Sequence, residues 1–126
     1  MDLVLSGTVP SEKLMKYTFG EPRSGNEKWA IDFDNYVPNS YRVVHAADLI
    51  PHVPPEYGDL GWKYKHASQE IWYNEACTNY TACGPNEDPN CSDSTHWLER
   101  NMEDHKHYFH IPDMGHACGK NITTSI

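Results

Sequence analysis

The feature that most restricts the fold of this chain is a strand–helix–strand pattern within its first 45 residues. Residues 14–19 form a β-type run, and a Gly-Glu-Pro turn signal follows directly. Residues 40–45 form a second run of β-branched and aromatic side chains. The segment between the runs carries apolar residues three and four positions apart, typical of one helix face: Trp29, Ala30, Phe33 and Tyr36. The pattern predicts an α/β fold with parallel strands and covering helices.

Beyond this unit the pattern is weaker. Prolines at three positions of residues 47–55 rule out a continuing helix or central strand and predict an ordered loop at a strand end. Residues 63–66 and 70–73 either pair as short antiparallel strands or run as one longer strand with a bulge. A helical stretch is expected somewhere within residues 97–109.

Charge and composition exclude two classes of partner. Acidic residues outnumber basic ones by 18 to 10, without a Lys/Arg cluster, so nucleic acid is not an expected partner. The apolar runs are only a few residues long, so no transmembrane segment is expected. Aliphatic residues are scarce, but four Trp and eight Tyr can supply a buried core.

Cysteines and glycosylation motifs gather in the last third of the chain. The four cysteines are Cys77, Cys83, Cys91 and Cys118. The Asn-x-Ser/Thr motifs begin at Asn79, Asn90 and Asn121. Together they favour an oxidising, secretory environment with disulfides, and three pairings of four cysteines remain open. The spacings do not match a zinc ribbon.

The first seven residues do not have the pattern of a signal peptide, since they lack a basic segment and a long apolar core. They read as the end of a helix with Gly7 just past it. We expect that the chain begins inside a larger domain whose earlier strands and helices are absent. The alternative is a frayed native N-terminus.

Candidate catalytic residues lie near strand ends and in a histidine-rich segment. Asp48 follows the strand at residues 40–45, where the carboxyl ends of parallel strands carry catalytic groups. It suits an acid that orients a histidine, although a turn or cap carboxylate is the alternative. Five of the eight histidines lie from His96 onward. They could bind a metal, with His107 paired to His105 or His110, or provide a general base. An acid that precedes a histidine fits the α/β-hydrolase order, but no Gly-x-Ser-x-Gly motif occurs.

Three segments resemble the class 3, fungal-type triacylglycerol lipases. Residues 18–26, TFGEPRSGN, resemble that family's TFG-x-PR-x-GN segment. Residues 42–55, RVVHAADLIPHVPP, resemble its RVVH-x-x-D-x-(V/I)-P-x-(L/V)-PP segment. Residues 104–109, DHKHYF, are similar to its DH-x-x-YF. The resemblance covers residues 13–118, and the order of the three segments makes it far more specific than any one of them.

The resemblance implies the carboxyl-terminal part of an α/β-hydrolase fold, so residues 1–126 would be one partial domain. It implies a secreted enzyme of lipid metabolism that hydrolyses ester bonds of acylglycerols at a lipid–water interface, without a metal or other cofactor. Asp48 would be the triad acid and His105 the general base; Asp104 is given no catalytic role. In the family, the nucleophile elbow, lid and oxyanion hole precede the TFG segment, and none of them is found in this chain.

The resemblance also bears on the cysteines. Cys83 and Cys91 are placed like a short loop bridge of several family members. Cys118 resembles a terminal cysteine whose partner lies near the start of the family's domain, so it would lack that partner here. Cys77 has no counterpart.

Two other functions stay open at this point. The first is a non-catalytic secreted module that keeps the lipase scaffold to bind lipid or a partner, which the absent serine motivates. The second is a histidine-rich metal binder. If the lipase interpretation holds, the chain alone should have no serine-dependent esterase activity.

Overall fold

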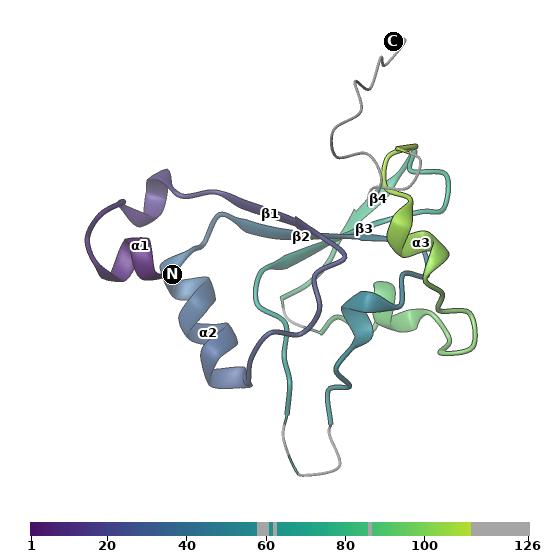
Figure 1. The fold of residues 1–126 in the computed structure, drawn as a ribbon, viewed down its shortest axis with the longest axis horizontal. Helices are drawn as coiled ribbons and strands as arrows, with labels where there is room; N and C mark the ends of the chain where they lie inside the picture. The colour runs from purple at the N-terminus through teal and green to yellow at the C-terminus, as the bar shows by residue number, and fades with distance from the viewer. Residues whose placement is uncertain (58–60, 62, 86, 112–126) are drawn as a thin grey trace.

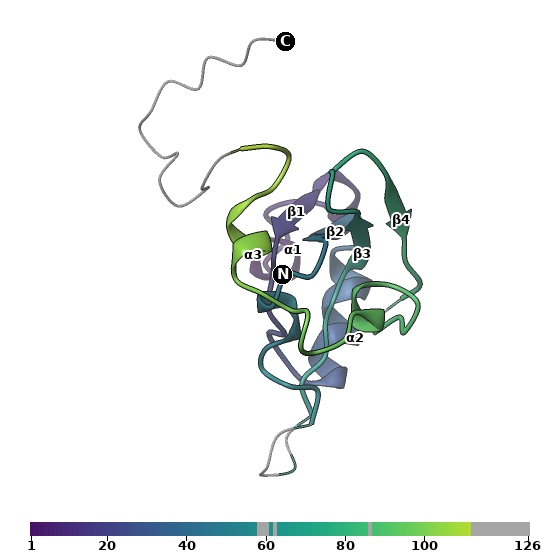
Figure 2. The same ribbon diagram turned by 90° about the vertical axis from the view of Figure 1, so that its right-hand side faces the viewer.

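The computed structural model describes residues 1–57, 61, 63–85 and 87–111. In this part of the chain, four strands form one sheet in the order β1-β2-β3-β4 (Figure 1). The strands are β1 (Lys16–Phe19), β2 (Ser40–His45), β3 (Gln69–Tyr73) and β4 (Tyr80–Ala82). The first three are parallel and β4 is antiparallel to β3. Figure 2 shows the four strands side by side in this order.

The predicted strand–helix–strand unit is confirmed as β1, α2 (Glu27–Tyr36) and β2. The helix begins where the Asn26 side chain accepts a hydrogen bond of 2.9 Å from the Trp29 backbone N–H, as an N-cap does. It ends at Val37, because Pro38 disfavours helical backbone in the residue before it. Parallel pairing runs from Lys16 opposite Ser40 to Phe19 opposite Val43.

The apolar core is small and lies on one face of α2, against residues that precede β1 and β3. Its buried members are Ala30, Phe33, Val37 and Ala67, with Met1, Leu14 and Trp29 packed around them. Tyr36, predicted on this face, is 40% exposed. Val37 takes its place because it lies four residues after Phe33 and so continues the same row of the helix.

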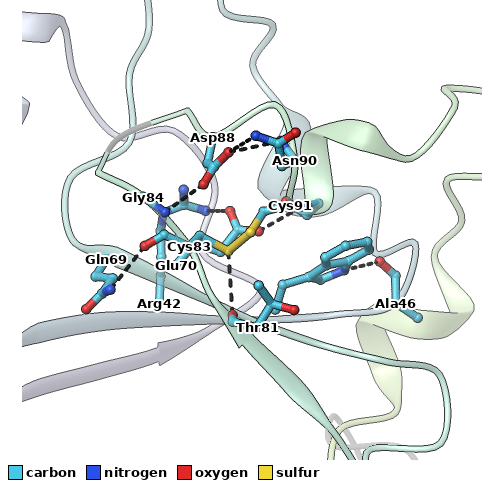
Figure 3. The surroundings of a disulfide bond; sticks show 12 residues. Arg42, Ala46, Gln69, Glu70, Thr81, Cys83, Gly84, Asp88, Asn90 and Cys91 are labelled. Carbon is cyan, nitrogen blue, oxygen red and sulfur yellow. Dashed lines mark hydrogen bonds and ion pairs between the residues drawn. A yellow bond between two sulfur atoms is a disulfide. The ribbon is translucent and has the colours of Figure 1, made fainter.

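The structure also buries a cluster of charged side chains. Arg42 of β2 and Glu70 of β3 are register partners, and their side chains form an almost fully buried ion pair of 2.7 Å. Glu70 Oε1 also accepts the backbone N–H of Ser92 at 3.0 Å. The Cys83–Cys91 disulfide lies beside this pair (Figure 3). The pair therefore joins two neighbouring strands to the disulfide-closed loop.

The Cys83–Cys91 bridge confirms the pairing implied by the family resemblance. Cys77 is a free thiol in the described part of the chain. Cys118 and Asn121 lie outside the described residues.

Arg23, which lies just before α2, connects several loops by hydrogen bonds. Its guanidinium group makes a bidentate contact with Glu87, at 3.1 and 2.8 Å, and donates to the carbonyl oxygen of His52 at 2.9 Å. The loop after β1 is thus fixed to the proline-rich loop after β2, which contains the short helix η2 (Ile50–His52). That proline-rich segment is the ordered loop that the sequence predicts.

Other predictions need correction. Residues 63–66 neither pair with residues 70–73 nor form one longer strand with them. Strand β3 takes its partners from β2 and β4, whereas Lys63 and Lys65 form isolated bridges with Tyr57 and Gly25. Strand β4 lies between Cys77 and Cys83, in the cysteine-bearing part of the chain for which the sequence predicts no strand. The helical stretch expected within residues 97–109 is the single turn α3 (Glu103–Lys106).

The remaining short elements are α1 (Asp2–Leu5), η1 (Ser11–Lys13) and η3 (Ser92–Ser94). Gly7 follows α1 with φ of +71° and donates its N–H to Val4 O, as predicted for a glycine past a helix end. In the described ranges, no helix combines the length and apolar character needed to cross a bilayer.

The buried ion pair leads to a stability prediction. Replacing Glu70→Gln leaves the Arg42 charge without its carboxylate in a buried position, so the free energy of unfolding should fall by about 3 kcal/mol or more. Glu12→Gln, a change at an exposed carboxylate, should stay within about 0.5 kcal/mol of the parent. Urea unfolding followed by circular dichroism measures both; equal midpoints for the two variants would contradict the prediction.

Candidate functional site

The candidate site lies at the carboxyl end of β2, where the sequence places Asp48. The chain turns at Ala46, whose φ is +43°, and Asp48 donates its backbone N–H to His45 O at 2.9 Å. Asp48 Oδ1 accepts the Ile50 N–H at 2.8 Å, so one carboxylate oxygen does act as a turn acceptor. The residue is completely buried, and its second oxygen points to the histidine segment.

His105 of α3 meets that second oxygen. Its Nδ1 lies 3.0 Å from Asp48 Oδ2, although the two residues are 57 positions apart. A carboxylate only accepts, so this contact places the proton of a neutral imidazole on Nδ1 and leaves the Nε2 lone pair free. The His105 side chain is 32% exposed, and Nε2 has no hydrogen-bond partner among the residues that the structure describes. The arrangement suits a general base that works from Nε2.

Tyr108 completes the surroundings of the carboxylate. Its hydroxyl donates to Asp48 Oδ2 at 2.6 Å and accepts the backbone N–H of His45 at 3.3 Å. Burial, the nearby Asp48 charge and this hydrogen bond raise the pKa of Tyr108 far above its ordinary value, so the hydroxyl stays protonated. The sequence alone predicts no role for Tyr108, although the tyrosine of the DH-x-x-YF motif is a signal for one.

Asp104 and Asn101 fix the histidine segment to the acid loop. Asp104 Oδ2 accepts the Ala47 N–H at 2.9 Å and the Asn101 side-chain amide at 3.0 Å. Asn101 also exchanges backbone hydrogen bonds with this loop, to Ala47 O at 2.9 Å and from Leu49 N–H at 3.0 Å. These four bonds hold α3 beside Asp48.

Gly20, at the end of β1, packs directly against the acid and the histidine. Its φ is +61°, and a Cβ built there would lie 2.6 Å from His105 Nδ1 and 2.7 Å from Asp48 Oδ2. Both values are far below a normal contact, so any side chain would force the pair to move. Three elements therefore converge on the site: the ends of β1 and β2, and α3.

The histidine-rich segment does not gather as a metal site in the described part of the chain. His107 donates from Nδ1 to Glu103 O at 2.8 Å, and its side chain is partly exposed. His107 and His110 line a cavity of about 270 Å³, but their ring nitrogens do not form a ligand cluster. The cluster that does occur joins Glu70 to Cys83 and Cys91, whose sulfurs are already bonded to each other. The described residues therefore do not support the metal-binding alternative.

The sequence of this chain is similar to those of known lipases. Residues 1–58 match the family model "Lipase (class 3)". Lipase ZK262.3 of Caenorhabditis elegans is 33% identical over 90% of the chain and 40% of its own length. Secreted mono- and diacylglycerol lipases of Malassezia and Fusarium also match.

Solved structures agree with these sequence matches. Lipase II from Rhizopus niveus superposes with a TM-score of 0.79 at 30% identity, over 90% of the chain and 42% of the lipase. A triacylglycerol lipase described as having a serine protease triad superposes with a TM-score of 0.73 at 28% identity, over 89% of the chain and 42% of the lipase. The chain thus spans about two fifths of the length of these relatives. The expected partial α/β-hydrolase fold is confirmed.

The contact at Gly20 leads to the first prediction for the site. Gly20→Ala should push the imidazole of His105 away from Asp48, so the downfield ¹H NMR signal of the shared Nδ1 proton should disappear. Gly7→Ala is the matched control, because Gly7 has a similar φ of +71° but open space around its Cβ. Both variants carry the backbone cost of a left-handed alanine, about 1 kcal/mol. Retention of the signal in Gly20→Ala would contradict the prediction.

A second prediction concerns Tyr108. Tyr108→Phe removes a hydrogen bond to a completely buried carboxylate and should lower the free energy of unfolding by about 2 kcal/mol at pH 7. Tyr80→Phe, at an exposed ring, should change it by less than about 0.5 kcal/mol. Denaturant titration compares the two variants; an unchanged Tyr108→Phe midpoint would show that the hydroxyl does not support the acid.

Proposed function

Because this chain belongs to the class 3 lipase family, we propose that it supplies the acid and the base of a Ser-His-Asp site that hydrolyses carboxylic ester bonds of acylglycerols. The observation that carries the proposal is the 3.0 Å contact between a completely buried carboxylate, Asp48, and the partly exposed imidazole of His105. Both residues occupy the positions of the acid and the histidine in the family's motifs.

In the proposed mechanism, His105 Nε2 removes the proton of a serine hydroxyl as the serine attacks the ester carbonyl. The same nitrogen then gives this proton to the leaving alcohol. Asp48 holds the imidazole in the tautomer that leaves Nε2 unprotonated, and its charge stabilises the imidazolium that forms. Tyr108 and Ile50 keep the carboxylate in place by donating to its two oxygens.

The nucleophile is proposed to come from residues outside these 126. No Gly-x-Ser-x-Gly motif occurs in the sequence, and the chain matches about two fifths of its relatives' length. The described surface supports this proposal, because β1 is the last described strand on its side of the sheet and exposes Tyr17 and Phe19, with Met15 exposed just before it. Residues 1–126 would then be one part of a larger hydrolase domain.

The proposed substrate is a lipid ester at a lipid–water interface, and the proposed location is outside the cell. Relatives named as secreted mono- and diacylglycerol lipases support both points. The Cys83–Cys91 disulfide supports the location, because disulfides persist in oxidising compartments. The proposed acid–base chemistry uses side chains alone.

A chimera tests this proposal. The carboxyl-terminal part of a class 3 lipase is replaced by residues 1–126, joined after its nucleophile segment, and turnover of a short-chain p-nitrophenyl ester is measured. We expect activity in the chimera and none in the chain alone. Asp48→Asn or His105→Ala should lower kcat by about 10³-fold or more, since the remaining groups of a triad enzyme give little rate alone.

His107→Ala is the matched control, because it removes a nearby, partly exposed histidine that does not contact Asp48, and it should leave kcat within about twofold. A folded chimera that hydrolyses the ester equally well without His105 would contradict the proposed roles. A folded chimera that binds lipid without turnover would instead support a non-catalytic module.

A further inference from the structure

We propose that Asn79 is an N-glycosylation site of this chain and that Asn90 is not. The inference rests on the secretory location in the proposed function, and not on its catalytic part. Both residues begin Asn-x-Ser/Thr motifs, so the sequence does not distinguish between them. The structure distinguishes them by the exposure of all three residues of each motif.

The motif at Asn79 is open along its whole length. Asn79 lies directly before β4, and Asn79, Tyr80 and Thr81 are all exposed, Tyr80 by 63%. The backbone of Asn79 is held by Asn74, whose N–H donates to Asn79 O at 3.0 Å. The side-chain amide of Asn79, in contrast, has no hydrogen-bond partner among the described residues, so it is free to react.

The surface beside Asn79 has room for a glycan. Among the described residues β4 is the last strand on its side of the sheet, and it borders a cavity of about 230 Å³ lined by Trp72, Tyr80 and Thr81 among others. Exposed strand edges are sites where chains pair and aggregate, and proteins commonly cover them. A glycan on Asn79 would stand at this edge and cover it.

Two of the three residues of the motif at Asn90 are buried. Cys91 is 1% exposed and is bonded to Cys83, while Ser92 is 3% exposed and donates its N–H to Glu70. The Asn90 side-chain amide is also engaged, because it donates to Asp88 Oδ1 at 3.2 Å (Figure 3). Asn90 itself is exposed, but the motif requires the hydroxyl residue as well as the asparagine, and folding of this loop buries Ser92.

The reaction needs a lipid-linked oligosaccharide diphosphate as the sugar donor. A bond forms between Asn79 Nδ2 and the anomeric carbon of the first sugar, while the bond from that carbon to the diphosphate oxygen breaks. The lipid diphosphate leaves with the electron pair, and Nδ2 loses one proton. No oxidant or reductant is required.

The test expresses the chain through a eukaryotic secretory pathway behind an added leader peptide, in an Asn121→Gln background that removes the third motif. Purified protein is treated with peptide N-glycosidase in H₂¹⁸O, which marks each formerly glycosylated asparagine, and peptides are mapped by mass spectrometry. We expect the mark in most molecules at Asn79 and in few at Asn90.

Variants exclude an effect of misfolding. Asn79→Gln and Thr81→Ala should each abolish the glycan-dependent mass shift, whereas Thr81→Ser, which keeps the motif, should retain it. Asn90→Gln should leave the mass shift unchanged. Marking at Asn90 instead of Asn79, or an unmarked Asn79, would overturn the inference. Esterase activity of the chimera is measured separately, so a failure here leaves the proposed catalytic roles standing.

Discussion

The site depends on one buried carboxylate, that of Asp48. A charge in this position is costly unless its oxygens are hydrogen-bonded, and here three donors approach them: the Ile50 N–H, the Tyr108 hydroxyl and His105 Nδ1. The donors come from the loop after β2 and from the segment around α3. The need to satisfy the carboxylate therefore brings together two parts of the chain that are more than 50 residues apart. The same contact that stabilises the acid also sets the tautomer of the histidine.

The scaffold around this carboxylate uses polar contacts where the aliphatic core is thin. Arg42 and Glu70 join β2 to β3, and Arg23 with Glu87 joins the loops beyond the sheet. Buried ion pairs add little net stability by themselves, but they penalise any arrangement that separates the partners. Such pairs suit a site whose acid, base and supporting loops must keep a fixed geometry. Close packing at Gly20, where no side chain fits, imposes the same requirement.

Local signals in the sequence predict a substantial part of this structure. The β1-α2-β2 unit follows from the two β-type runs, the turn signal after the first run and the apolar spacing between them, and the loop after β2 follows from its prolines. Asp48 and His105 are predicted as a pair by ordered family motifs, and the structure brings them together. What the sequence does not reveal depends on distant contacts: β4 pairs because β3 offers it an edge, and its three residues are all exposed, so the strand has no buried face of its own. The roles of Tyr108 and Asp104 cannot be predicted from the sequence for the same reason. They depend on hydrogen bonds to Asp48 and Ala47, which only folding places beside them.

The role of Asp48 in orienting His105 is best tested by measuring which ring nitrogen of His105 carries the proton in the folded protein. Nitrogen-15 NMR of histidine-labelled protein, with His105 assigned by comparison with His105→Gln, distinguishes the two neutral tautomers. We expect a proton on Nδ1, facing Asp48, and an unprotonated Nε2 able to act as a base. A neutral ring that carries its proton on Nε2 would contradict this expectation, because Asp48 would then not be holding the histidine for general-base catalysis.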